Sequence, residues 1–216
     1  MDHATSGSTL QLSKHRIEAL VDGIFAVAMT LLVIELRLPE HLNPVGDAAL
    51  REALVELLPN FSSWLVSFVV LGIFWMSNHR IYSHVRHADG PLIWWTFLML
   101  AGASLLPFAS AVNGRNYSQL AQAVYSGVMI LTTIGSLMVC RYVHRNPQLC
   151  SHPMDAATYR AACARLGGLV VIAVAAWALA GLFPGSANFA FLLTFALGPL
   201  GKAVQRRSGL AQPTRP

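Results

Sequence analysis

The sequence predicts an all-α integral membrane protein with six transmembrane helices, and three observations carry that prediction. Hydrophobic residues make up 55% of the 216 positions and charged residues only 12%, whereas a soluble domain has about 25% charged residues. The mean hydropathy is +0.52. The apolar residues also fall into long runs, and short stretches rich in Pro, Gly and Asn separate these runs.

Six of these runs reach or approach the length of about 20 residues that a helix needs to cross a bilayer. The sixth is the weakest because Gly198, Pro199 and Gly201 lie near its end. The division of the chain that follows is a cytoplasmic tail (1–16), a six-helix transmembrane domain (17–204) and a second cytoplasmic tail (205–216). The six spans cover residues 17–38, 61–78, 92–112, 121–143, 161–183 and 188–204.

The segment at residues 47–59, between the first two spans, has apolar residues at helical spacing, and Asp47 stands in a capping position. We expect either an interfacial helix or an outer extension of the second span. Pro59 would kink or end that helix.

The distribution of basic residues predicts the orientation. With a cytoplasmic N-terminus, twelve Lys and Arg residues lie inside, and only Arg37, Arg51 and Arg115 lie outside. Such an excess follows the positive-inside rule, so both termini are expected in the cytoplasm. The three cysteines form no CxxC pair and lie in or beside a cytoplasmic loop, which predicts free thiols. They are Cys140, Cys150 and Cys163.

Five acidic residues crowd the outer mouth of the first two spans. They raise the local cation concentration, or they belong to an ordinary solvated loop. They are Glu35, Glu40, Asp47, Glu52 and Glu56.

The first span, RIEALVDGIFAVAMTLLVIEL (residues 16–36), has two different faces. Val27, Leu31 and Ile34 recur at i, i+4 and i+7 and form one aliphatic stripe, with Thr30 about 60° from it and Asp22 about 140° from Val27. The polar end is expected to bond to neighbouring helices. The stripe faces lipid, the protein core or some other surface. Small residues that allow a close helix approach are Gly23, Ala26 and Ala28.

A second polar group ends the second span, in FWMSNHRIYSHVRH (residues 74–87). Because the first two spans are antiparallel, we expect these side chains at the same depth as Arg16 and Asp22, in one network. The network residues of the second span are Trp75, Asn78 and His79. The spacing of His79, His84 and His87 lacks an i, i+4 pair, so no metal site is expected.

These two stretches resemble the first two spans of the bacterial relatives of transmembrane protein 175, the endosomal and lysosomal potassium channel. The first resembles the family pattern of Arg, Phe-Ser-Asp, Gly, Phe-Ala and a TLLV-E finish. LVSFVVLGIFWMSNHRIY, at residues 65–82, resembles its Ser-Phe, Gly, Trp and His-His pattern. Two departures stand out: Leu20 and Val21 replace Phe-Ser, and Asn78, which cannot become charged, replaces the first histidine.

The resemblance implies a homotetramer in which the first helix of each subunit lines a central potassium pathway. It implies that Val27, Leu31 and Ile34 form rings at the constriction, with Thr30 near the bottleneck. It also implies that a polar network holds the pore helix in place. The residues that match this network are Arg16, Asp22, Trp75 and His79, with Asn78 beside them.

We therefore expect a potassium-preferring, weakly selective cation channel in the inner membrane of a bacterial cell. Its expected partners are copies of itself, membrane lipid and the permeant potassium ion, with no cofactor and no nucleic acid. No TVGYG-like filter occurs, and no GxSxG, HExxH or nucleotide-binding motif points to an enzyme. The alternatives are a non-catalytic membrane scaffold and a proton-coupled or small-solute transporter. In the transporter, Glu18, Asp22 and His79 form the protonation site.

Overall fold

The computed structural model describes residues 12–38, 46–116 and 118–182, together with Leu193 and Ala203. Within this part, five helices are long and apolar enough to cross a membrane, so the chain is a multi-pass membrane protein. The sixth predicted span, 188–204, lies outside the described residues except for those two positions. The five helices are α1 (Lys14–Leu31) with its 3-10 continuation η1 (Leu32–Glu35), α3 (Leu58–Tyr82), α4 (Gly90–Arg115), α5 (Gln119–Arg145) and α6 (Ala156–Leu182).

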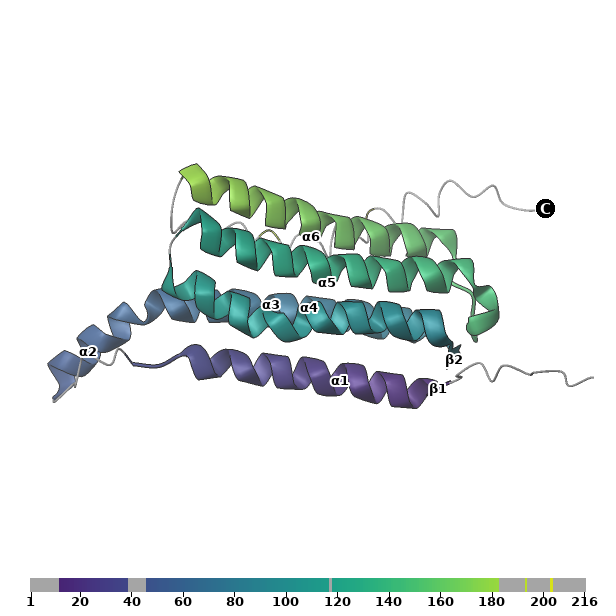
Figure 1. The fold of residues 1–216 in the computed structure, drawn as a ribbon, viewed down its shortest axis with the longest axis horizontal. Coiled ribbons are helices and arrows are strands. Elements are labelled where there is room, and N and C mark those ends of the chain that lie inside the picture. The colour runs from purple at the N-terminus through teal and green to yellow at the C-terminus, as the bar shows by residue number, and fades with distance from the viewer. Residues whose placement is uncertain (1–11, 39–45, 117, 183–192, 194–202, 204–216) are drawn as a thin grey trace, which may run out of the picture.

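The five helices lie side by side, with α1 along one edge of the bundle and α6 along the opposite edge (Figure 1). Helix α4 lies in the middle and packs on α1, α3 and α5, while α6 packs on α5. Because α1 is an edge helix, the described chain covers only the side of α1 that faces α3 and α4.

Helices α4 and α5 approach most closely at two glycines. A Cβ on Gly135 would lie 2.5 Å from Cα of Met99, and a Cβ on Gly102 would lie 2.8 Å from the backbone nitrogen of Thr132. Small residues of this kind let membrane helices pack backbone against backbone. The small residues expected from the sequence to allow a close helix approach lie on the first span. There, Gly23 has no atom of another element within 4 Å of where its Cβ would be.

The interior of the bundle is mostly apolar, and some of its buried polar side chains bond to one another. Phe74, Met99 and Met129 are fully buried in the core. Nearer α2, Ser67 Oγ lies 2.8 Å from Ser110 Oγ and 3.1 Å from the Tyr125 hydroxyl. These contacts join α3, α4 and α5, and they satisfy hydroxyl groups that would otherwise be costly to bury.

Helix α2 (Asp47–Glu56) projects past one end of the bundle, and only Leu57 separates it from α3 (Figure 1). It has the position expected of an outer extension of α3, with Pro59 in the first turn of that helix. The expected capping role of Asp47 is wrong. The N-cap is Gly46, whose φ of 92° suits glycine, and Asp47 is the first helical residue.

The opposite end of the bundle carries a small antiparallel pairing that the sequence analysis did not predict. Strand β1 (Leu12–Ser13) pairs with β2 (His87–Ala88), which lies between α3 and α4. The backbone nitrogen of Arg86 also donates to the carbonyl of Leu149, over 2.7 Å, in the 3-10 turn η2 (Pro147–Leu149). The start of α1 is therefore tied to the α3–α4 connection, which is itself tied to the α5–α6 connection.

The expectation of free thiols is confirmed, because all three cysteines are unpaired. Cys150 lies in the α5–α6 connection, where burial raises the pKa of its thiol. A raised pKa keeps this thiol protonated and unreactive at neutral pH.

Candidate functional site

Helix α1 has one buried face and one exposed face. The buried face is a continuous row at helical spacing, and each of its side chains is at most 4% exposed. This row packs against α3 and α4 and fixes the rotation of the helix. Its members are Ile17, Val21, Phe25, Ala28 and Leu32.

The exposed face of α1 carries the aliphatic stripe predicted from the sequence. Val27 is 55% exposed, Leu31 42% and Ile34 46%. Thr30 is also exposed, and its hydroxyl donates to the carbonyl of Val27 over 2.9 Å. Three large aliphatic side chains therefore point away from the bundle along one helix.

The stripe crosses a change in helix geometry. The α-helix ends at Leu31, and residues Leu32–Glu35 form a 3-10 turn. The first span was expected as one helix reaching residue 38, and that boundary is wrong by three residues. Just beyond the turn, Leu36 donates its backbone N–H to the carbonyl of Val33 over 3.0 Å.

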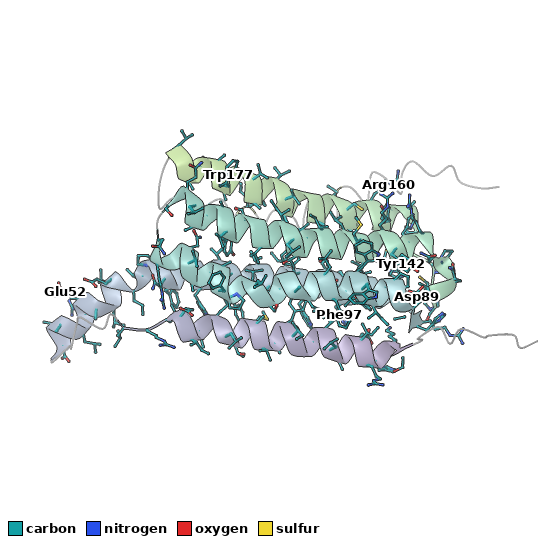
Figure 2. All side chains as sticks on the ribbon, viewed as in Figure 1. Glu52, Asp89, Phe97, Tyr142, Arg160 and Trp177 are labelled. Carbon is teal, nitrogen blue, oxygen red and sulfur yellow. The ribbon has the colours of Figure 1, made fainter. Side chains whose placement is uncertain are left out.

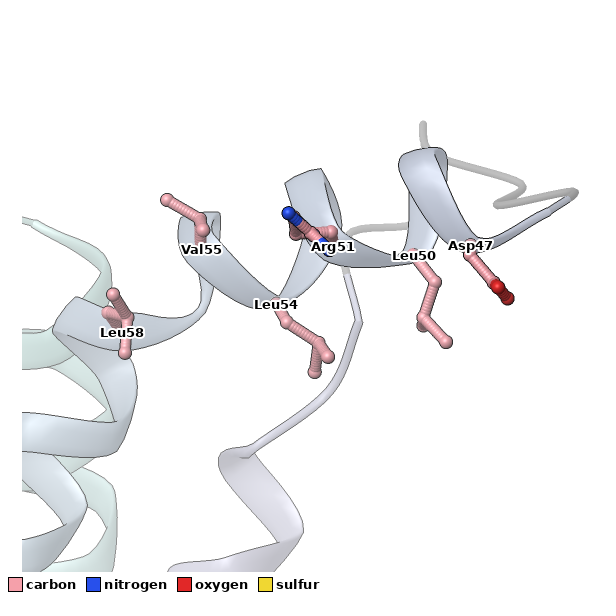
Figure 3. Close-up of a pocket in the computed structure, with 6 residues that line it drawn as sticks. All are labelled: Asp47, Leu50, Arg51, Leu54, Val55 and Leu58. Atoms are coloured by element: carbon pink, nitrogen blue, oxygen red, sulfur yellow. The ribbon is translucent and has the colours of Figure 1, made fainter.

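Glu35 at the end of this turn is paired. Arg115 Nη2, at the end of α4, donates to Glu35 Oε2 over 2.7 Å. Of the other acidic residues predicted at this mouth, Glu40 lies outside the described residues, and the remaining three lie in α2, where Figure 3 shows Asp47. The acidic cluster is therefore divided between η1 and a helix that projects from the bundle.

Near the β1–β2 end of α1, Asp22 is bonded to α3. Trp75 Nε1 donates to Asp22 Oδ1 over 2.8 Å, and the ring of His79 stacks on Trp75 with centroids 5.9 Å apart. A cleft of about 140 Å³ opens beside this group. It is lined by Glu18, Val21, Asp22, Trp75, His79 and Tyr82.

The two other residues assigned to this network lie apart from the Asp22–Trp75 bond. Arg16 is exposed and forms no ion pair with Asp22, while Glu18 is paired with Lys14 over 3.5 Å. Asn78 is buried and donates from Nδ2 to the carbonyl of Phe74 over 2.9 Å. The structure thus brings together three of the five network residues.

The three histidines considered for a metal site do not gather. His84 Nδ1 lies 3.1 Å from the carbonyl oxygen of His152, while His79 stacks on Trp75. Among the residues that the structure describes, no group of three or more His, Cys, Asp or Glu side chains could hold a metal ion.

Asp89 is a structural residue that the sequence analysis missed. One oxygen, Oδ1, accepts from the backbone nitrogen of Leu92 over 3.1 Å and caps α4, while Oδ2 accepts from the Tyr142 hydroxyl over 2.6 Å. Figure 2 shows Asp89 and Tyr142 together at the β1–β2 end. A capping residue before GPLIWW could have been recognised from the sequence, but its partner 53 residues later could not.

Comparisons with known proteins agree on one family. The model of the endosomal/lysosomal potassium channel TMEM175 family matches residues 16–107, which include α3 and all but the first two residues of α1. A protein from Streptomyces collinus named as a potassium channel is 32% identical over 151 residues, covering 68% of this chain and 72% of the relative. One from Chamaesiphon minutus, also named as a potassium channel, is 34% identical over 123 residues, covering 55% of this chain and 60% of the relative.

A solved structure has the same fold. The crystal structure of a lysosomal potassium-selective channel TMEM175 homolog from Chamaesiphon minutus superposes with a TM-score of 0.72 at 25% sequence identity. The match covers 87% of this chain and 97% of that chain. On these similarities in sequence and structure, the chain belongs to the TMEM175 family.

Proposed function

We propose that this chain forms a homotetrameric, potassium-preferring and weakly selective cation channel whose constriction is made by α1 of each subunit. The observation that carries the proposal is the exposed aliphatic stripe of Val27, Leu31 and Ile34 on an edge helix whose opposite face is fully buried. One helix cannot enclose a hole. Copies related by a symmetry axis would bring the same stripe together around that axis.

Small residues on the exposed face support contact between copies rather than with lipid alone. Gly23 and Ala26 are exposed beside the stripe, and small side chains allow helices of neighbouring subunits to approach closely. The expected close approach on this helix would then lie between subunits. Thr30 adds a hydroxyl oxygen at the level of the stripe.

An aliphatic constriction implies a particular kind of selectivity. A ring of Leu or Ile side chains offers no oxygen ligands to replace the hydration shell of an ion, so passage depends on the radius of the ring and on its wetting. We therefore propose a preference for potassium with appreciable leakage of sodium.

The positive-inside distribution of Lys and Arg supports an orientation with the β1–β2 end in the cytoplasm and α2 outside. In a bacterial cell the membrane is then the inner membrane. The acidic residues of α2, together with Glu35, would stand at the outer entrance.

The test is potassium flux through purified protein in liposomes, followed by single-channel recording in planar bilayers. Leu31→Ala and Ile34→Ala should each change the unitary conductance at least several-fold, because each widens one ring. Leu179→Ala is the matched control, since Leu179 is 39% exposed on α6 at the far edge of the bundle. Oligomeric protein that carries no potassium current contradicts the proposal, and so does an unchanged conductance in both stripe variants.

A second candidate function is a proton-coupled or small-solute transporter, and the cleft beside Asp22 and His79 favours it. In this case Asp22 and His79 would exchange protons as the transporter changes conformation. Saturable, pH-driven uptake that is lost in Asp22→Asn, with no channel-like current in the wild type, would support this function over the channel.

A further inference from the structure

The 3-10 turn changes the direction in which Ile34 points. An α-helix advances about 100° per residue, so Ile34 would lie about 60° around the helix from Leu31. A 3-10 helix advances about 120° per residue, which places residues i and i+3 in line. Because η1 begins at Leu32, 3-10 geometry brings Ile34 toward the line of Leu31. Both side chains are exposed.

Arg115, which lies outside η1, forms an ion pair with Glu35, the last residue of this turn. Its side chain donates to Glu35 over 2.7 Å, and the two residues are 80 positions apart in the sequence. Arg115 is the last residue of α4, the helix that packs closely on α5. The pair therefore ties the end of η1 to the end of α4.

The Glu35–Arg115 pair is formed with η1 in 3-10 geometry, and α-helical geometry would place Glu35 elsewhere. Over the four residues of η1, α-helical geometry would shorten the segment by about 2 Å and turn Glu35 by about 80°. The carboxylate would then have to reach Arg115 from a different side of the helix and a different height. Conversely, loss of the pair removes the interaction between side chains that favours the 3-10 form.

We infer that the Glu35–Arg115 ion pair is a latch that keeps η1 in 3-10 geometry and so holds Ile34 in line with Leu31 at the constriction. Glu35 and Arg115 are positioning residues, because they act through Ile34. The inference rests on the proposed function, since it assigns these residues a role in the proposed pore. It adds a determinant of conductance that lies outside the stripe.

The variants that test the latch are Glu35→Gln, which is isosteric, and Arg115→Gln, which shortens the side chain; each removes one charge. The double variant Glu35→Arg/Arg115→Glu exchanges the two charges and so restores an ion pair between the same positions. Glu52→Gln is the matched control, because Glu52 is an exposed acidic residue of α2 at the same end of the molecule (Figure 2). It removes the same charge from the outer entrance and leaves η1 unchanged.

Two measurements are needed. The first is unitary conductance: both single variants should raise it at least twofold, the exchange should bring it back toward the wild type, and Glu52→Gln should not change it. The second is the rate of crosslinking between subunits through Ile34→Cys or Leu31→Cys, in a background without the native cysteines. Breaking the latch should slow crosslinking at position 34 several-fold and leave position 31 unchanged.

The possible results distinguish a failure of the latch from a failure of the proposed channel function. If the wild type conducts and the single variants match it in both conductance and crosslinking at position 34, the latch is wrong and the channel stands. If the wild type carries no current, the proposed function fails, and the crosslinking rates still decide whether Glu35 and Arg115 position residue 34. A conductance change of equal size in Glu52→Gln would assign the effect to surface charge and overturn the latch.

Discussion

Trp75 and Asp22 form a hydrogen bond of 2.8 Å that joins α3 to α1 near the β1–β2 end of the bundle. Asp22 lies on the exposed side of α1, and Trp75 is 38% exposed. The bond therefore anchors α1 at a point that the apolar packing of its buried face does not reach. It restrains the same helix that the Glu35–Arg115 pair holds at the other end.

Trp75→Phe tests this anchor, because phenylalanine keeps an aromatic ring and removes the indole donor. We expect a loss of about 1.5 kcal/mol in the free energy of unfolding, the low end for a hydrogen bond to a charged group, because the site is partly exposed. Thermal unfolding in detergent measures it. Trp95→Phe is the control, because Trp95 is 37% exposed and its indole has no hydrogen bond among the described residues. Equal losses in the two variants would show that the bond contributes nothing specific.

Gly135→Ala tests the close approach of α4 and α5. The added Cβ would meet the backbone of Met99 at 2.5 Å, so we expect the helices to be forced apart at a cost of about 1–3 kcal/mol. Gly127→Ala lies on the same helix, where a Cβ meets nothing within 4 Å. It should be neutral or stabilising by up to about 1 kcal/mol, because alanine favours the helix. The melting temperature of Gly135→Ala should fall while that of Gly127→Ala stays constant or rises, and an equal fall in both would contradict the assignment.

Asp89→Ala removes both the cap of α4 and the acceptor of the hydrogen bond from the Tyr142 hydroxyl. The cap contributes about 1 kcal/mol, and the Tyr142 hydroxyl bond adds about 1.5 kcal/mol because its acceptor is charged. Tyr142→Phe should cost only the second amount. In a double-mutant cycle the two changes should be non-additive. Simple additivity in chemical or thermal unfolding would mean that the 2.6 Å bond carries no coupling.

Asp155 gives a pH dependence whose sign follows from its pKa. The carboxyl lies just before α6, where hydrogen bonding from Thr158 lowers its pKa below the ordinary value of 3.8. A lowered folded-state pKa contributes stability that is fully present above the ordinary pKa and is lost as the pH falls through the folded value. The melting temperature of the wild type should therefore exceed that of Asp155→Ala by a constant amount down to about pH 4 and by less below it. Asp155→Asn keeps a capping side chain that does not titrate, and it should show no such decrease.

The positions of the first five spans and the two faces of α1 were predictable, because hydropathy and helical periodicity are local properties of the chain. The residues at which the helices begin and end were less predictable. The change to 3-10 geometry at Leu32 and the cap at Gly46 depend on backbone geometry that apolar runs do not encode. Strands of two residues, such as β1, have too few positions to show alternation.

The sequence by itself determined that α1 carries an aliphatic stripe and a polar end on different faces, since 3.6 residues per turn places each residue on its face. Only the tertiary structure decided which face the bundle covers, where Trp75 meets Asp22, and that Arg115 reaches Glu35 across 80 positions. Contacts between distant residues depend on how helices pack and rotate against one another. That packing is fixed by the close approach of α4 to α5 and by the buried row of α1, which are properties of the assembled bundle.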